Sequence, residues 1–362
     1  MAKREEQLKR LIAAVTPPDE TARARAKEQW DSLAKPLSSL GLLEDAVTKL
    51  AALQETSCVQ VSSPRLAVFC ADNGVVARGV TQCGSEVTAK VAVALAENRS
   101  SVSPLAAAAE CPVIPVDMGM LDFGGHPGVR NLRIRNGTGD ISCGPAMSRE
   151  ECLRAMLSGA EIARELTEKG TDLLLVGEMG IGNTTTAAAV TAVLLELPPG
   201  QVVGRGAGLS DEGLERKREA LRRALRLNCP DPRDPVDVLA KVGGLDLAAM
   251  CGAYLGAAAC RTGVLLDGIV GIVAALCACR LCPAAGKALL ASHVSAEPAA
   301  PRILEAVGLE APLHARLCLG EGSGAVLMLE LLKMALGLYR SGQSFTRLGI
   351  EPYVPQTEEK TC

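Results

Sequence analysis

Apolar and polar residues follow two alternating patterns along the chain. Short apolar runs of strand length are separated by longer stretches in which apolar residues recur at helical spacing. The apolar runs span residues 65–71, 111–116, 172–176 and 263–266. The helical stretches span residues 85–97, 148–169, 184–195, 211–227 and 235–260. Strands that alternate with helices predict βαβ units, and therefore an α/β fold built on a mostly parallel, Rossmann-like sheet.

Both ends of the chain have helical patterns. Residues 1–55 are amphipathic, with breaks at Pro17-Pro18 and at Lys35-Pro36, and residues 322–338 form a strong helical pattern. We therefore expect helices before and after the α/β region, which we place at residues 61–325.

The four apolar runs end alike. Asp72, Asp117, Glu178 and Asp267 follow the runs, and a glycine follows each acid closely. The carboxyl ends of parallel strands meet at one edge of a sheet, where open α/β sheets bind their ligands. A single acid after a strand is often a turn former, but four of them predict a shared acidic crevice.

The segment GEMGIGNTTT, residues 177–186, resembles a phosphate-binding loop without its lysine, because Asn183 stands in the lysine position. Gly180 and Gly182 would let backbone N–H groups approach an anion at the start of the following helix. Glu178 would repel a triphosphate. These residues suit a ligand with one phosphate at one end and hydroxyls or a cation at the other, such as a ribose 5-phosphate carrying a pyridinium ring. Ordinary helix capping by Asn183 and Thr184 is the alternative.

Composition excludes several classes of function. The chain has 362 residues, a net charge of −3, and only 3 Phe, 3 Tyr and 1 Trp, so we expect no nucleic-acid partner. The 14 cysteines lie scattered among apolar residues with only 3 histidines, which predicts reduced core cysteines and no metal site. The N-terminus lacks the apolar segment of a secretory signal, and the longest apolar stretch, 268–279, is too short to span a bilayer. We expect a cytoplasmic protein.

With the next three residues included, the segment GEMGIGNTTTAAA resembles the signature of the nicotinate-nucleotide:dimethylbenzimidazole phosphoribosyltransferase family. Other segments match that family in the same order: DSLAKPLSSLGLLEDAVTKLAALQ, ADNGVVARGVT, NGTGDISCGPAMSREE, DPVDVLAKVGGLDLAAMCG, LLDG, SHVSAEP and LCLGEGSGAVL. The resemblance covers almost the whole chain. It implies a three-layer α/β/α domain, plus a small helical domain that joins residues 1–60 to residues 326–362.

The resemblance also implies a reaction. The family transfers the 5-phosphoribosyl group of nicotinate mononucleotide to a lower-ligand base, 5,6-dimethylbenzimidazole by default. The products are nicotinate and α-ribazole 5′-phosphate, which is used in assembling the nucleotide loop of cobamides. No metal or organic cofactor is implied, and the family is typically homodimeric.

Site residues follow from the same resemblance. Glu321, in LGEGSG, matches the general base that accepts the proton of the incoming base, and Glu178 matches the second active-site glutamate. Residues expected to bind the phosphate, the ribose or nicotinate are Gly180, Gly182, Asn183, Thr184, Lys217, Asp267, Ser292, Ser295, Asp72 and Leu319. His293 is expected to be structural.

Three departures affect the base rather than the reaction. Asn73 replaces the usual histidine of the ADNG segment, and Ala299-Ala300 replaces a common Gly-His pair. Cys83 and Val91 stand where well-known members place polar residues against the base, so we expect a more apolar base pocket. A paralogue that uses adenine, another benzimidazole or a phenol remains an alternative, as does one that needs a partner subunit.

Rival enzyme classes lack their motifs. A P-loop NTPase requires the missing lysine, and a Rossmann dehydrogenase requires GxGxxG after the first strand. Retention of both Glu178 and Glu321 argues against a paralogue that depends on a partner.

Overall fold

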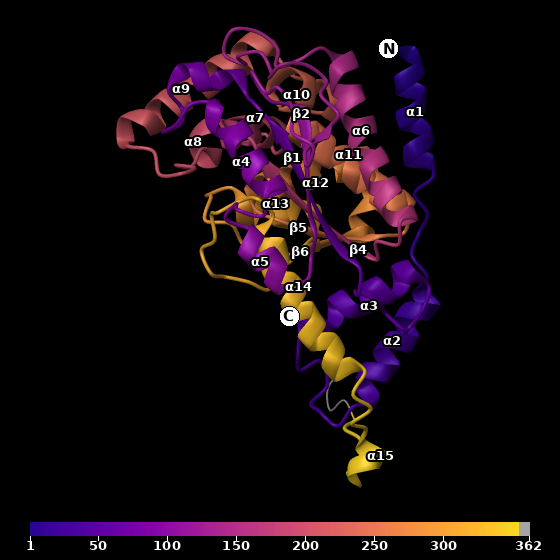
Figure 1. Ribbon diagram of the computed structural model, residues 1–362. Helices are drawn as coiled ribbons and strands as arrows, with labels where there is room; N and C mark the ends of the chain where they lie inside the picture. The colour runs from indigo at the N-terminus through magenta and orange to yellow at the C-terminus, as the bar shows by residue number, and fades with distance from the viewer. Residues whose placement is uncertain (355–362) are drawn as a thin grey trace.

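The computed structural model describes residues 1–354, in which parallel strands form a six-stranded sheet (Figure 1). The strands are β1 (Pro64–Ala71), β2 (Val113–Gly119), β3 (Arg130–Asn131), β4 (Leu173–Met179), β5 (Gly263–Leu266) and β6 (Leu289–Ala291). Their order is β3-β2-β1-β4-β5-β6. The chain winds outward in both directions from the centre, so the connections diverge between β1 and β4, where such sheets bind ligands. The predicted α/β class with a parallel, Rossmann-like sheet is confirmed.

The two central strands form the buried middle of the sheet. Val68 pairs with Gly177 and Phe69 with Glu178, so β1 and β4 reach the carboxyl edge together. Both strands are almost wholly buried, as expected where helices cover both faces. The short strands β3 and β6 were not predicted, because two or three residues show no periodicity.

Helices cover both faces of the sheet. On one face lie α4 (Glu86–Ala96) and α14 (Ser323–Tyr339), and on the other lie α11 (Leu245–Ala259) and α12 (Ile269–Leu281). The predicted three-layer arrangement is therefore confirmed. Other helices of this region are α5 (Ser103–Ala108), α6 (Arg149–Glu168), α7 (Asn183–Leu194), α8 (Pro199–Val202), α9 (Asp211–Asn228), α10 (Pro235–Val242) and α13 (Ala300–Val307).

The helices α6 and α11 pack unusually closely through glycines. A Cβ atom on Gly252 would overlap the carbonyl oxygen of Met156, and one on Gly159 would overlap the carbonyl oxygen of Ala249. The backbones therefore touch, and no side chain larger than hydrogen fits at these two positions.

One predicted helix is wrong. The stretch 235–260 is two helices, α10 and α11, separated at Gly243-Gly244. A Cβ atom on Gly244 would lie 2.7 Å from Oδ1 of Asn73, so the chain must bend without a side chain there. The break places Asp246 in the first turn of α11 instead of mid-helix.

The terminal helices divide between two places (Figure 1). The helices α2 (Glu20–Ser32) and α3 (Leu42–Gln54) lie beside the C-terminal part of α14, where the rings of Trp30 and Tyr339 stand 5.0 Å apart. The first helix, α1 (Ala2–Ala13), instead lies along α6 and α11. A short helix, α15 (Phe345–Leu348), follows α14. Of the expected C-terminal segment 326–362, residues 355–362 lie outside the described residues.

No helix among residues 1–354 has the length and apolar character needed to cross a membrane. Within the same residues every cysteine is free, and no cluster of three potential metal ligands occurs.

Candidate active site

A cavity of about 250 Å³ opens at the carboxyl edge of the sheet, beyond β4 and β5. Its walls come from the ends of these strands, the starts of α7 and α12, the segment after β6 and the loop that precedes α14. Most of the predicted site residues line it: Glu178, Gly180, Asn183, Thr184, Asp267, Ser295, Leu319 and Glu321. The cavity thus lies beside the point where the strand order diverges, as the topology predicts.

The glycine turn after β4 gives the cavity an open helix N-terminus. Gly182 has φ +91°, and a Cβ atom on Gly180 would lie 2.5 Å from the carbonyl oxygen of Ala71. Gly182 is the N-cap of α7 and no side chain caps this helix, so Asn183 and Thr184 are helical residues and the capping interpretation is wrong. The uncapped N–H groups leave a site suited to an anion.

Asn183 uses its side chain to hold two carboxylates. Its amide donates to Glu178 and, across 3.2 Å, to Oδ2 of Asp246. Burial raises the pKa of Glu178 to about 8, and the nearby Asp246 carboxylate adds to the effect. Burial likewise raises the pKa of Asp246 to about 6. Glu178 therefore carries a proton at neutral pH.

Glu321 lines the same cavity from the loop that precedes α14. It is 8% exposed, has φ +59°, and its Oε2 accepts the N–H of Val102 at 3.0 Å. A Cβ atom on Gly177 would lie 2.6 Å from the carbonyl carbon of Glu321, so β4 touches the backbone that presents this glutamate. A Cβ atom on Gly320 would lie 2.9 Å from Oε1 of Glu178. The two glutamates therefore converge.

Asp267 fixes the start of α14. Its two carboxylate oxygens accept the N–H groups of Gly322 at 2.9 Å and Gly324 at 2.8 Å. A carboxylate at this end of a helix is stabilised by the helix dipole. Asp267 thus positions the loop that carries Glu321, in addition to lining the cavity.

A buried lysine lies behind the first turn of α7. Lys217, fully buried on α9, donates through Nζ to Oγ1 of Thr184 at 2.8 Å and to the carbonyl oxygen of Gly204 at 3.2 Å. Burial lowers the pKa of Lys217 to about 8, so the ammonium is mostly charged at neutral pH. Across the same loop, the Glu297 carboxylate accepts the N–H of Gly206 at 2.8 Å.

Residues 15–350 match a family model described as phosphoribosyltransferase. Nicotinate-nucleotide–dimethylbenzimidazole phosphoribosyltransferase of Acetivibrio thermocellus is 42% identical over 91% of this chain and 94% of its own length. The chain belongs to this family. The enzyme of the same name from Thermus thermophilus is 43% identical over 86% of this chain and 93% of its own. The crystal structure of CobT from Thermus thermophilus covers 92% of this chain and 100% of its own, with a TM-score of 0.86 and 40% identity.

Cys83 and Val91, the two residues that the family resemblance places at the incoming base, do not line the same cavity. A smaller cavity of about 100 Å³ adjoins the first across Gly180–Thr184, and Cys83 lines it together with Val80 and Leu209. Val91 is half-buried on α4 and lines neither cavity. Thr81, Gln82 and Arg205 also line this smaller cavity, so its wall is mixed, and the more apolar base pocket expected at Cys83 and Val91 stays a prediction.

The predicted shared crevice is wrong for two of its four acids. Asp72 is fully buried and accepts the N–H of Leu121 at 2.7 Å. Asp117 forms an ion pair with Arg133 at 2.9 Å. Neither lines the cavity, so only Glu178 and Asp267 of the four do so. The strand order explains the position of Asp117, because β2 lies on the far side of β1 from the cavity, whereas Asp72 follows β1 itself and instead holds the backbone of Leu121.

Ser292 lies just outside the cavity wall. It is fully buried and its hydroxyl is 2.9 Å from Nδ1 of His293, which does line the cavity. Burial lowers the pKa of His293, so the imidazole is neutral at neutral pH.

Two acidic residues at the site, Asp246 and Glu297, were not predicted. Asp246 follows a glycine pair inside a stretch that looks wholly helical, and Glu297 lies in the SHVSAEP segment without a clear pattern. The glycine pair before Asp246 repeats the association of glycine and acid seen at the strand ends, and it could have indicated this site.

Proposed function

We propose that this protein transfers the 5-phosphoribosyl group of nicotinate mononucleotide to 5,6-dimethylbenzimidazole, as its family does. Nicotinate and α-ribazole 5′-phosphate are the products, for use in the nucleotide loop of cobamides. The observation that carries the proposal is the convergence of Glu178 and Glu321 in a cavity beside an uncapped helix N-terminus.

The phosphate would bind at the start of α7. The uncapped N–H groups of this helix attract an anion, and Thr184 lines the cavity in contact with the Lys217 ammonium. An ammonium has three donors, and two of them already hold Thr184 and Gly204. The third is free to meet a phosphate oxygen that enters beside Gly206.

Glu321 would act as the general base. A nitrogen of the incoming base attacks the anomeric carbon while the bond to the nicotinate ring breaks, and its electron pair neutralises the pyridinium nitrogen. The proton on the other azole nitrogen then passes to Glu321. The hydrogen bond from Val102 holds one carboxylate oxygen and leaves the other free to accept this proton.

Glu178 would serve the nicotinate and ribose side. As a neutral acid at pH 7 it can donate a hydrogen bond to the nicotinate carboxylate or to a ribose oxygen without repelling the substrate's negative groups. Asn183 fixes its orientation. Alignment of both rings on opposite faces of the ribose supplies much of the rate enhancement.

The deciding assay uses purified protein with nicotinate mononucleotide and dimethylbenzimidazole, and follows nicotinate release by chromatography. We expect turnover that requires the base and that collapses in Glu321→Gln. Release of nicotinate only with adenine or a phenol would overturn the assigned base, and silence with every acceptor would overturn the reaction.

Assembly and location are also part of the proposal. We propose a homodimer that acts in the cytoplasm without nucleic acid, with a small helical unit of α2, α3 and the end of α14. Exposed Leu327, Met334 and Leu338 on α14 support the dimer, because their helical spacing forms an apolar row. Sedimentation analysis should show a dimer that Met334→Glu weakens. A monomeric wild-type protein would contradict it.

A further inference from the structure

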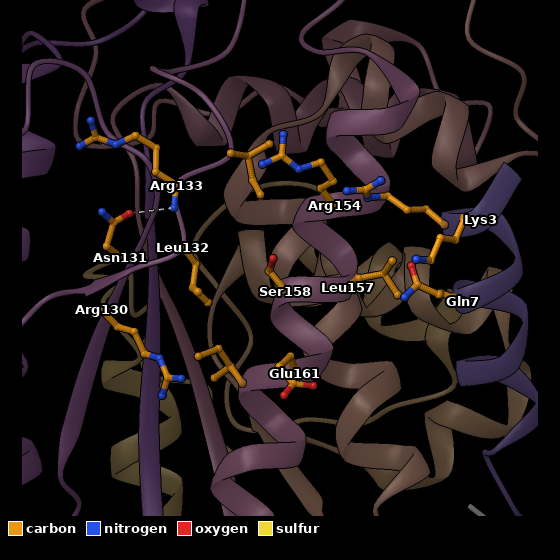
Figure 2. A pocket seen from close by; sticks show the side chains of 13 residues that line it. Lys3, Gln7, Arg130, Asn131, Leu132, Arg133, Arg154, Leu157, Ser158 and Glu161 are labelled. Atoms are coloured by element: carbon orange, nitrogen blue, oxygen red, sulfur yellow. Dashed lines mark hydrogen bonds between the residues drawn. The ribbon is translucent and has the colours of Figure 1, made fainter. Parts of the chain in front are cut away.

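A second and larger cavity lies far from the proposed catalytic site. This cavity, of about 640 Å³, is a groove between α1, α6 and residues 130–134, and we call it the α1–α6 groove (Figure 2). It shares no lining residue with the catalytic cavity. The strands β3 and β4 are about 14 Å apart at the usual strand spacing, so the two cavities open at different parts of the sheet.

Positive charge dominates the lining of this groove. The cationic residues are Lys3, Arg4, Arg130, Arg133 and Arg154, whereas Glu161 is the acid among the lining residues. In Figure 2 these side chains come from both walls of the groove, with Arg130 and Arg133 on one side and Lys3 on the other. A protein with a net charge of −3 thus concentrates cations in its largest described cavity.

The cations are not all neutralised by the protein. Arg4 pairs with Glu150, Arg130 with Glu165, and Arg133 with Asp117. Lys3 and Arg154 form no ion pair with any residue from 1 to 354. Two unpaired cations beside three others create a potential that attracts an anion from solution.

The floor between the cations is partly apolar. Leu132, Ile134 and Leu157 are half-buried there, and Ile162 lies deeper. The volume falls within the range of small-molecule sites. Such a lining fits a compact ligand with an apolar or ring-shaped body, rather than an inorganic ion alone.

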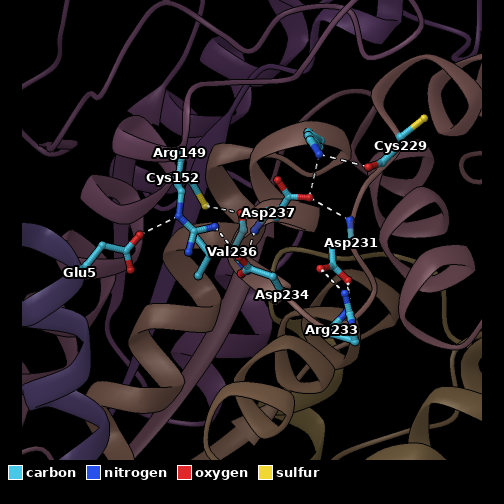
Figure 3. Close-up of polar contacts among 10 residues, drawn as sticks. Glu5, Arg149, Cys152, Cys229, Asp231, Arg233, Asp234, Val236 and Asp237 are labelled. Atoms are coloured by element: carbon cyan, nitrogen blue, oxygen red, sulfur yellow. Dashed lines mark hydrogen bonds and ion pairs between the residues drawn. The ribbon is translucent and has the colours of Figure 1, made fainter. Parts of the chain in front are cut away.

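Ion pairs hold α1, the helix that forms one wall of the groove, against α6. Arg149, at the start of α6, contacts Glu5 at 2.6 Å and Asp234 at 2.7 Å (Figure 3). The α-ammonium group of Met1 pairs with Glu150 at 2.9 Å. These contacts place Lys3 and Arg4 over the groove. The family match begins at residue 15, after α1, so this wall lies outside the matched region.

We propose that the α1–α6 groove binds a phosphorylated small molecule, with at least two negative charges on its phosphate groups and an apolar or ring-shaped body. Arginine favours such groups because its planar fork donates two parallel hydrogen bonds to a phosphate. Lys3 and Arg154 are the main anchors, since neither forms a direct ion pair among residues 1–354, and Glu150 interacts with Arg154 only at longer range while it pairs with Arg4 and Met1. This site is independent of the proposed catalysis.

The test is calorimetric titration of ADP into the full-length protein at low ionic strength, with pyrophosphate as a second probe. Lys3→Ala/Arg154→Ala should weaken ADP binding at least tenfold. Lys9→Ala/Arg223→Ala should bind like the wild type, because it removes the same charge from two exposed cations outside the groove. Pyrophosphate should bind more weakly than ADP, since it lacks the ring.

Several outcomes would overturn the proposal. One is the absence of ADP binding to the wild type. Another is equal ADP binding by both double variants, which would place the ligand in the catalytic cavity or on the general surface. Equal affinity for pyrophosphate and ADP would refute a contribution of the apolar floor to ligand binding. Nicotinate release without ADP should be unchanged in Lys3→Ala/Arg154→Ala, which shows that the variant folds and separates this test from that of the catalytic function.

Discussion

Lys217 Nζ lies 2.8 Å from Oγ1 of Thr184 and forms no ion pair within residues 1–354. A fully buried ammonium with no carboxylate in ion-pair contact is costly for the folded protein, and the more distant Glu297 carboxylate offsets this cost only in part. Its position against the first turn of α7 fits the proposal that a substrate phosphate supplies further counter-charge.

Lys217→Ala should raise KM for nicotinate mononucleotide at least tenfold and lower kcat much less. The phosphate is bound equally in the ground state and the transition state, so its loss affects mainly KM. Initial-rate kinetics will measure both constants. Arg218→Ala, on the same helix and paired with Glu215, is the control and should change neither. A lower kcat with unchanged KM would refute phosphate binding by Lys217.

Glu321→Gln should lower kcat by roughly 10² to 10⁴ and leave KM for nicotinate mononucleotide within about threefold, because general base catalysis contributes on that scale. The glutamine retains the shape and can still accept the hydrogen bond from Val102. Glu305→Gln, an exposed residue on α13, should behave like the wild type. A Glu321→Gln enzyme with normal kcat would exclude this residue as the base.

Glu178 makes stability depend on pH. Its pKa is about 8 in the folded protein against an ordinary value of 4.5, so the folded protein keeps this proton as pH rises while the unfolded chain releases it. Its stabilising contribution is complete below about pH 4.5 and is lost as pH rises through about 8. Glu178→Gln cannot ionise. We therefore compare the free energy of unfolding of Glu178→Gln with that of the wild type at each pH. The difference, variant minus wild type, should be about 1 to 3 kcal/mol larger at pH 8 than at pH 5.

Urea denaturation at both pH values measures this difference. Glu28→Gln, at an exposed position on α2, is the control and should give the same difference at each pH. A Glu178→Gln effect that does not change with pH would show that the carboxyl is not held neutral by burial.

Glu297→Gln should lower KM for nicotinate mononucleotide about three- to tenfold. Its carboxylate lines the catalytic cavity, holds the N–H of Gly206 and lies near the Lys217 ammonium, so it competes with a phosphate for the same groups. Substrate titration of the two enzymes compares their affinities. An increase in KM would mean that Glu297 instead binds a substrate hydroxyl.

Gly252→Ala should destabilise the protein by about 2 to 3 kcal/mol, because the added methyl group overlaps the backbone of α6. Gly337→Ala is the matched control. It also lies within a helix, but nothing lies within 4 Å of its added Cβ atom, so it should stabilise by about 0.5 to 1 kcal/mol. Denaturant unfolding of the two variants should give shifts of opposite sign. Equal shifts would contradict the close helix packing.

The sequence predicts best where one segment suffices. Apolar runs locate β1 and β5, and five helices begin and end within one residue of their predicted bounds: α4, α6, α7, α9 and α14. The glycine turn after Glu178 was also predicted, because Gly180 and Gly182 each stand where the backbone leaves no room for a side chain or has a positive φ.

The remaining features depend on distant segments. Asp246 contacts Asn183 from the first turn of α11, which begins after the break at Gly243-Gly244, and a side chain on Gly244 would collide with Asp246 and with Asn73. Likewise, Asp72 and Asp117 share a motif with Glu178 but contact other partners, which the strand order decides for Asp117 and the Leu121 backbone decides for Asp72. Local pattern locates an acid at an edge of the sheet, whereas packing decides which cavity it faces.

The close approach of Gly177 to the backbone of Glu321 has a consequence for redesign of the active site. Gly177, the residue before Glu178, is in contact with the backbone of Glu321. The positions of the two carboxyl groups therefore depend on the same backbone contact. Any change that widens this spacing, including a single methyl group at position 177, shifts both glutamates at once. Substitutions meant to admit a larger acceptor should therefore leave the contact between Gly177 and Glu321 unchanged.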